Sequence, residues 1–220
     1  MDYQFTDPGL LVQALTHKSF AGAHNERLEF LGDAVLGYVV AERLFEQRPG
    51  DHEDTMSLLR ASLVRKETLA EVARELCLGD CLRLGVGVRR GGGHRIDSIL
   101  ADALEAVIGA VHLDGGIEPA RRLVVHLFDE RMRTLDPEAL KDAKTRLQEL
   151  LQGAGLELPE YAIESAAGSA HARLFTVTCR VAALDLQVRA EGRSRRAAEK
   201  RAAADMLERV AQRLEGGDLA

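Results

Sequence analysis

Three acidic residues recur at helical spacing in the segment from His24 to Asp33. Glu26, Glu29 and Asp33 stand at positions i, i+3 and i+7, so a helix with about 3.6 residues per turn places them on one narrow face. Like charges at this spacing repel one another, and apolar residues flank the stripe. A bound divalent cation would relieve this repulsion, and carboxylate oxygens are hard ligands that suit Mg²⁺ or Mn²⁺. This helix alone leaves a solvated acidic face open as the alternative.

A second acidic pair lies in a strongly apolar segment between Ser98 and Ala110. Asp102 and Glu105 stand at i and i+3, and the apolar residues around them predict a buried helix. An acidic pair on each of two buried helices predicts a cage of four carboxylates. Two solvated acidic surfaces would explain this coincidence poorly.

These two segments resemble the ribonuclease III family. Residues 25–33 (NERLEFLGD) match the family signature along its length, and residues 100–106 (LADALEA) match its second acidic motif. Hydrolysis by two metal ions needs several carboxylate ligands and no side-chain nucleophile. We predict that the metal ligands are Glu29, Asp33, Asp102 and Glu105. We predict that the catalytic acids are Asp33 and Glu105, with Glu26 and Glu53 in supporting roles. For Glu53 an equal alternative is an acid at a helix start, where the helix dipole favours it.

Four other positions in this half of the chain bear on the resemblance to ribonuclease III. Phe30 lies next to the acidic stripe, where an aromatic residue either fills the core or is an exposed anchor. The family's phenylalanine that matches Phe30 inserts into a partner subunit, so the resemblance implies a homodimer with Phe30 at its interface. His17, in the tetrad THKS, could be catalytic, but a packed or capping histidine is the favoured interpretation. Asp54 stands where the family commonly has glycine, and Val88 where it commonly has glutamate.

A loop rich in glycine and arginine covers residues 79–94. Its core, GVGVRRGGG, lacks the Lys-Ser/Thr ending of a phosphate-binding P-loop, and no strand is expected before it. No nucleotide cofactor is therefore expected.

The sequence changes its pattern after residue 135. Before it, helical periodicity dominates; after it, a helix at 142–152 precedes three short strands, at 161–166, 173–181 and 184–191, and an alanine-rich helix that reaches about Leu214. This α-β-β-β-α order resembles a double-stranded RNA-binding domain. We therefore predict a multidomain chain. Its parts are an all-α ribonuclease III nuclease domain (1–136), a linker (137–141) and a small α+β double-stranded RNA-binding domain (142–214).

Basic residues crowd the start of the last helix, where the helix dipole adds partial positive charge. Together they form a predicted phosphate clamp, for which A-form RNA offers phosphates on both sides of its major groove. The resemblance implies that residues of the first helix and of a strand-connecting loop reach 2′-hydroxyls in the minor groove. Ala190 stands where many members have glycine. The predicted RNA-binding residues are Gln148, Glu149, Gly168, His171, Arg193, Arg195 and Arg196.

The net charge of −6 taken alone counts against a nucleic-acid partner. However, the acidic excess lies within residues 1–137, whereas residues 138–220 carry 13 basic and 13 acidic residues. A basic patch is therefore local. Three cysteines without a Cys-x-x-Cys pair fit a reducing cytoplasm, and neither a signal peptide nor a membrane span is expected.

The predicted function is a homodimeric, double-stranded-RNA-specific endoribonuclease that uses Mg²⁺, with Mn²⁺ as a substitute. The resemblance implies one site per subunit, 5′-phosphate and 3′-hydroxyl ends, and short 3′ overhangs. Expected substrates are ribosomal RNA precursors and other structured transcripts. A non-catalytic RNA-binding scaffold is the alternative, but it gives no reason to keep four facing acids. A metal-binding helical regulator would leave the RNA-binding pattern unexplained.

Overall fold

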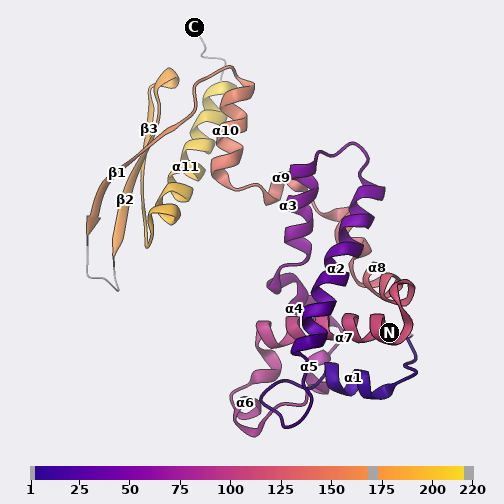
Figure 1. The fold of residues 1–220 in the computed structure, drawn as a ribbon. Helices are drawn as coiled ribbons and strands as arrows, with labels where there is room; N and C mark the ends of the chain where they lie inside the picture. Colours follow the sequence, from indigo (N-terminus) through magenta and orange to yellow (C-terminus); the bar gives the residue numbers. More distant parts are fainter. Residues whose placement is uncertain (1–2, 168–172, 216–220) are drawn as a thin grey trace. The chain divides into compact units, whose positions relative to one another are not determined.

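The structure is a computed structural model that describes residues 3–167 and 173–215. The chain divides into two compact units, with the division between Pro137 and Glu138. Figure 1 shows the elements of each unit. The first unit is helical, and the second has two longer helices and a three-stranded antiparallel sheet. The predicted fold class is confirmed.

The helical unit is built around the contact between α2 and α7, the most extensive between any two of its elements (Figure 1). Its elements are α1 (Pro8–Ala14), α2 (Glu26–Gln47), α3 (Glu53–Leu63), α4 (Lys66–Glu75), α5 (Leu78–Cys81), α6 (Val86–Arg90), the 3-10 turn η1 (Gly93–Arg95), α7 (Asp97–Gly115) and α8 (Ile117–Thr134).

The apolar pattern of α7 explains its central position. Residues such as Leu100, Leu104 and Ile108 are fully buried, and α1, α2, α4 and α8 all pack against this helix. Burial of each such side chain stabilises the fold by roughly 1.5–3 kcal/mol. Asp102 and Glu105 therefore lie on the helix that forms the centre of the core.

The glycine- and arginine-rich stretch at 79–94 is not a plain loop, as the sequence suggested. It contains α5, α6 and η1, three turns too short to show a helical period in sequence. Val88 packs inside this region, because a Cβ added at Gly93 would overlap its side chain. The position where the family commonly has glutamate thus has a packing role here.

The second unit contains α10 (Ala143–Gly153), β1 (Glu160–Ala167), β2 (Leu174–Val181), the 3-10 turn η2 (Ala182–Leu184), β3 (Leu186–Gly192) and α11 (Arg195–Glu215). The strands lie in the order β1-β2-β3, and Cys179 is paired with Tyr161 on one side and Val188 on the other. Leu147 and Leu151 of α10 join the sheet and α11 in one apolar core. A short helix, α9 (Pro137–Leu140), occupies most of the expected linker.

None of the helices within residues 3–167 and 173–215 is both long and apolar enough to cross a membrane.

Candidate functional site

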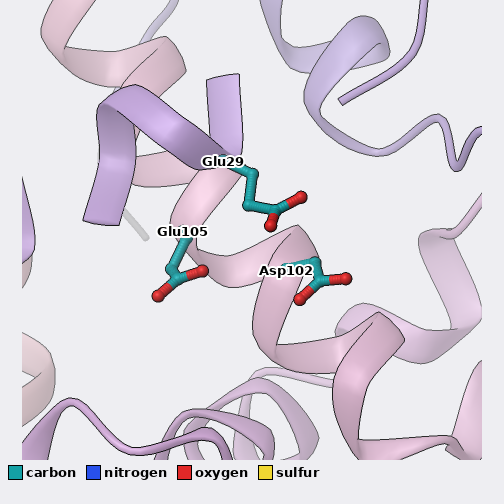
Figure 2. Close-up of side chains that lie close together, drawn as sticks. All are labelled: Glu29, Asp102 and Glu105. Carbon is teal, nitrogen blue, oxygen red and sulfur yellow. The ribbon is translucent and has the colours of Figure 1, made fainter. Parts of the chain in front are cut away.

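Three carboxylates meet where α2 crosses α7. Oxygen atoms of Glu29, Asp102 and Glu105 all lie within 4.8 Å of one another, and each side chain is half-buried. Figure 2 shows Glu29 extending from α2 toward the face of α7 that carries the other two acids. These three residues are called the acidic cluster below. The sequence predicted all of its members.

Two glycines allow the helices to come close enough to form the cluster. A Cβ at Gly32 would overlap the backbone carbonyl of Glu105, and a Cβ at Gly109 would overlap the carbonyl of Leu28. Only glycine fits where two backbones touch in this way. The crossing brings Glu29, one turn before Gly32, beside Glu105.

Burial is the largest effect on the pKa values of the acidic cluster. Burial first, and then the charges of Asp33, Glu29 and Asp102, raise the pKa of Glu105 to about 8. Burial also raises the pKa of Glu29 and of Asp102. At a pKa of about 8, the carboxyl group of Glu105 keeps its proton near neutral pH unless a cation joins it. Hard oxygen donors at this spacing suit a divalent ion such as Mg²⁺, so the residues present fit a metal.

The other predicted acids differ in how they relate to this cluster. Asp33 is exposed and lies outside the 4.8 Å group, although its charge is the largest one acting on Glu105. Glu26 forms an ion pair with Lys18 at 2.8 Å, which lowers the pKa of Glu26. It lies at the edge of the cluster, in a cavity that Glu29 and Asp102 also line.

Glu53 lies far from the acidic cluster of its own chain. It lines a cavity of about 260 Å³ with Leu44 and Phe45, near the end of α2, and its carboxylate accepts a hydrogen bond from Ser57 at 2.7 Å. At about 1.5 Å per residue, Leu44 is about 22 Å along α2 from Glu29. Within one chain the predicted supporting acid is therefore not brought to the site.

Phe30 is exposed on α2, beside Glu29. It has 82% of its surface accessible, the largest fraction among the large exposed hydrophobic residues of the described chain. An aromatic side chain left in water to this degree is typical of an interface anchor. Filling the core of its own domain, the other role considered from sequence, is excluded.

The predicted RNA-binding residues that the structure describes are all exposed. Gln148 and Glu149 lie on α10, and the three arginines, Arg193, Arg195 and Arg196, lie just before or in the first turn of α11. Gly168 and His171 lie outside the described residues. Ala190, by contrast, is buried in the core of this unit.

One buried acid beside the arginines was missed from sequence. Glu199 is 9% exposed and accepts hydrogen bonds from Lys144 Nζ at 2.9 Å and Arg195 Nε at 2.7 Å. It therefore joins the starts of α10 and α11. The i, i+4 spacing of Arg195 and Glu199 could have predicted their ion pair. No local pattern predicts the contact with Lys144, which is 55 residues away in the chain.

Two families match this chain. Residues 7–131 match the family described as ribonuclease-III-like, and residues 143–210 match the double-stranded RNA binding motif. The boundary between these matches agrees with the division into two compact units.

Similar proteins extend over nearly the whole chain. Proteins named ribonuclease 3 from Vibrio atlanticus and Bordetella pertussis are each 51% identical to it over 209 residues, 94% of this chain and 93% and 82% of theirs. The ribonuclease 3 of Colwellia psychrerythraea is 50% identical over 208 residues, 94% of this chain and 78% of its own.

Solved structures match the helical unit. The nuclease domain of ribonuclease III from Campylobacter jejuni is 47% identical, with a TM-score of 0.58 over 61% of this chain and 92% of that one. A second structure of that domain is described as having structural flexibility in the region involved in dimer formation. It is 49% identical, with a TM-score of 0.57 over 58% of this chain and 90% of that one.

Proposed function

The chain belongs to the ribonuclease III family and is an endoribonuclease of double-stranded RNA, and we propose that its acidic cluster and Asp33 hold the Mg²⁺ ions of the reaction. The observation that carries this proposal is the acidic cluster itself, in which oxygen atoms of three carboxylates lie within 4.8 Å of one another. When bound, two such ions supply an activated water and charge relief at the phosphate. Mn²⁺, which takes the same oxygen ligands, is the expected substitute.

In this proposal the helical unit holds the metal ions and the second unit binds the RNA duplex. Glu29 on α2 and Glu105 on α7 are held by the glycine crossing, so two of the carboxylates are positioned before RNA arrives. Asp33 supports them as the exposed fourth acid, and Glu26 stays paired with Lys18 at the cavity edge. The arginines at the start of α11 supply the phosphate contacts that bind the duplex.

A cleavage assay tests this function directly. Purified protein is mixed with a perfect RNA duplex, with and without Mg²⁺, beside single-stranded RNA and a DNA duplex. We expect Mg²⁺-dependent cuts in the RNA duplex alone, with 5′-phosphate and 3′-hydroxyl ends and short 3′ overhangs. Binding without cutting, in Mg²⁺ and in Mn²⁺, would support the non-catalytic scaffold instead. Ribosomal RNA precursor stems and other structured transcripts are the proposed substrates.

We also propose a homodimer in which Phe30 of each copy enters the cavity near the end of α2 of the other. The cavity is partly apolar, with Leu44, Phe45 and Met56 in its lining. In a two-fold dimer the same contact occurs twice. Glu53 lines this cavity, so the proposed contact would bring it near Phe30, and hence near Glu29, of the second copy. This supports the supporting role predicted for Glu53.

Phe30→Asp should convert the dimer to monomers, with a loss of at least about 100-fold in dimer affinity. The substitution removes the buried aromatic contact and places a carboxylate in a cavity that Glu53 also lines. Sedimentation velocity at several protein concentrations measures this. The control is Leu113→Asp, which changes another exposed apolar residue in the same unit and should leave the dimer intact. A Phe30→Asp protein that sediments as the wild type does would refute the interface.

Glu199→Gln should weaken duplex RNA binding by about tenfold, even though it removes a negative charge beside the RNA-binding surface. Arg195 donates through Nε to Glu199, which leaves its terminal nitrogens free for a phosphate. Without the carboxylate, Arg195 loses this orientation. Fluorescence anisotropy at fixed salt measures the affinity. The control is Glu208→Gln, an exposed acid on the same helix, and tighter binding by Glu199→Gln would contradict the prediction.

A reducing, cytoplasmic setting is the proposed location of this activity. The three cysteines are all free, with Cys77 and Cys81 exposed and Cys179 buried, which suits such a compartment. The functional boundaries proposed for the domains remain 1–136 and 142–214.

A further inference from the structure

His17 shares a cavity with the acidic cluster but has no role in the mechanism above. The cavity has a volume of about 210 Å³, and its lining includes His17 together with Glu29 and Asp102. The ring is neither fully buried nor fully exposed. The hydrogen bonds of the ring determine which of its nitrogens can act in this cavity.

The hydrogen bonds of His17 fix its tautomer. The backbone N–H of Ser19 lies 3.1 Å from Nδ1 of the ring, and the Ser19 hydroxyl lies 2.8 Å from the same nitrogen. A backbone N–H can only donate, so Nδ1 is the acceptor and the ring proton is on Nε2. Burial, and next the charge of Lys18, lower the pKa of His17, so the ring stays neutral near pH 7.

The backbone around His17 is anchored to a distant part of the chain. His17 N donates to the carbonyl of Arg83 at 3.1 Å, and Arg83 N donates to the carbonyl of Leu15 at 2.8 Å. Gly85 N donates to the Ser19 hydroxyl at 3.0 Å, and a Cβ at Gly85 would overlap the Ser19 backbone. The imidazole is therefore held beside the acids by the fold itself and needs no ion to place it.

The capping role considered from sequence does not fit this geometry, whereas a packed histidine is compatible with it. Helix α1 ends at Ala14 with Leu15 as its C-cap, and α2 begins after Asn25, so His17 caps neither. A metal ligand is also excluded in this tautomer, because Nε2 carries a proton and Nδ1 is occupied. Within the described residues Nε2 has no hydrogen-bond partner, so a donor remains free at the cavity.

We propose that His17 Nε2–H donates a hydrogen bond to a phosphate oxygen of the RNA strand held at the acidic cluster. This inference rests on the proposed function. The cavity is also lined by Glu26, Glu29 and Asp102, and the cation in its lining, Lys18, is paired with Glu26. A phosphate brings unprotonated oxygens to this cavity, and a neutral donor can bind them without repelling the metal ions. A preorganised donor also costs no reorganisation when charge develops on the phosphate. His17 is then a catalytic residue that touches the substrate.

The test compares His17→Ala with His17→Gln, whose amide carries an N–H donor at about the reach of the histidine Nε2. We expect His17→Ala to lower kcat on duplex RNA by about 100-fold with little change in KM, and His17→Gln to recover at least about tenfold of this loss. Mg²⁺ affinity without RNA, measured by calorimetry, should be the same in both variants. His126→Ala, an exposed histidine on α8, is the control and should cleave as the wild type does.

Each other outcome has a distinct meaning. A His17→Ala protein with the kcat of the wild type, or a His17→Gln protein as inactive as His17→Ala, would overturn the proposed hydrogen bond. A fall in Mg²⁺ affinity would overturn it as well, because His17 would then act on the metal. If the wild type itself leaves duplex RNA uncut in Mg²⁺, the proposed function fails first.

Discussion

Glu105→Gln should abolish cleavage of duplex RNA, with a loss of at least about 1,000-fold in kcat, while duplex binding stays within about threefold of the wild type. Glutamine keeps the size of the side chain but removes the charge that would hold a metal ion. The predicted phosphate-binding arginines lie in the other compact unit, so the substitution leaves them unchanged. Single-turnover cleavage and fluorescence anisotropy measure the two quantities.

The same substitution should also change how stability depends on pH in the metal-free protein. The pKa of Glu105 is raised from 4.5 to about 8, chiefly by burial. Between these values the unfolded chain is ionised at this position while the folded chain keeps its proton, so the free energy of unfolding falls as pH rises. The Tm of the wild type should therefore drop between about pH 5 and about pH 8, and the Tm of Glu105→Gln should drop less.

A control separates this effect from a general change in charge. Glu71→Gln removes an exposed acid of α4 in the same unit and should leave both cleavage and the pH profile of Tm unchanged. In the wild type, Mg²⁺ binding should release a proton near neutral pH, because Glu105 must ionise to become a ligand. Active Glu105→Gln protein would show that another group holds the ions. Loss of RNA binding together with cleavage would indicate a folding role.

The arrangement of the acids was largely predictable from the sequence, because helical period fixes which residues share a face. The spacing of Asp102 and Glu105 and the apolar residues around them predicted both the helix and its burial, and the structure has both. Local spacing cannot predict which acids meet across two helices. The structure brings Glu29 into the group and leaves Asp33 outside it, a difference that depends on how α2 and α7 pack against each other.

Contacts between distant segments account for what the sequence did not predict. The anchoring of the backbone around His17 was not predicted, because Arg83, which accepts from His17 N, and Gly85, which donates to Ser19, lie far along the chain. The contact of Glu199 with Lys144 was missed for the same reason. The short helices within 79–94 were missed because a single turn has no period to detect. Pairings of this kind become visible only once the chain is folded.

Gly32→Ala should be the most damaging single-methyl change in the helical unit. The added Cβ would overlap the carbonyl of Glu105 and would force α2 and α7 apart, at a cost of about 3 kcal/mol in the free energy of unfolding. The same movement separates Glu29 from Glu105, so cleavage should fall by about 100-fold even in molecules that remain folded, because a shift of about 1 Å at an active site has effects of this size. Thermal denaturation and cleavage well below Tm measure the two losses.

Gly37→Ala is the matched control, because it makes the same change in the same helix. A Cβ at Gly37 meets nothing within 4 Å, so alanine there should stabilise α2 by about 0.5–1 kcal/mol through its higher helix propensity. Opposite signs for the two substitutions would show that the close crossing, not helix propensity, determines the requirement at Gly32. If Gly32→Ala were as stable and as active as the wild type, the spacing of the acids could not depend on this contact.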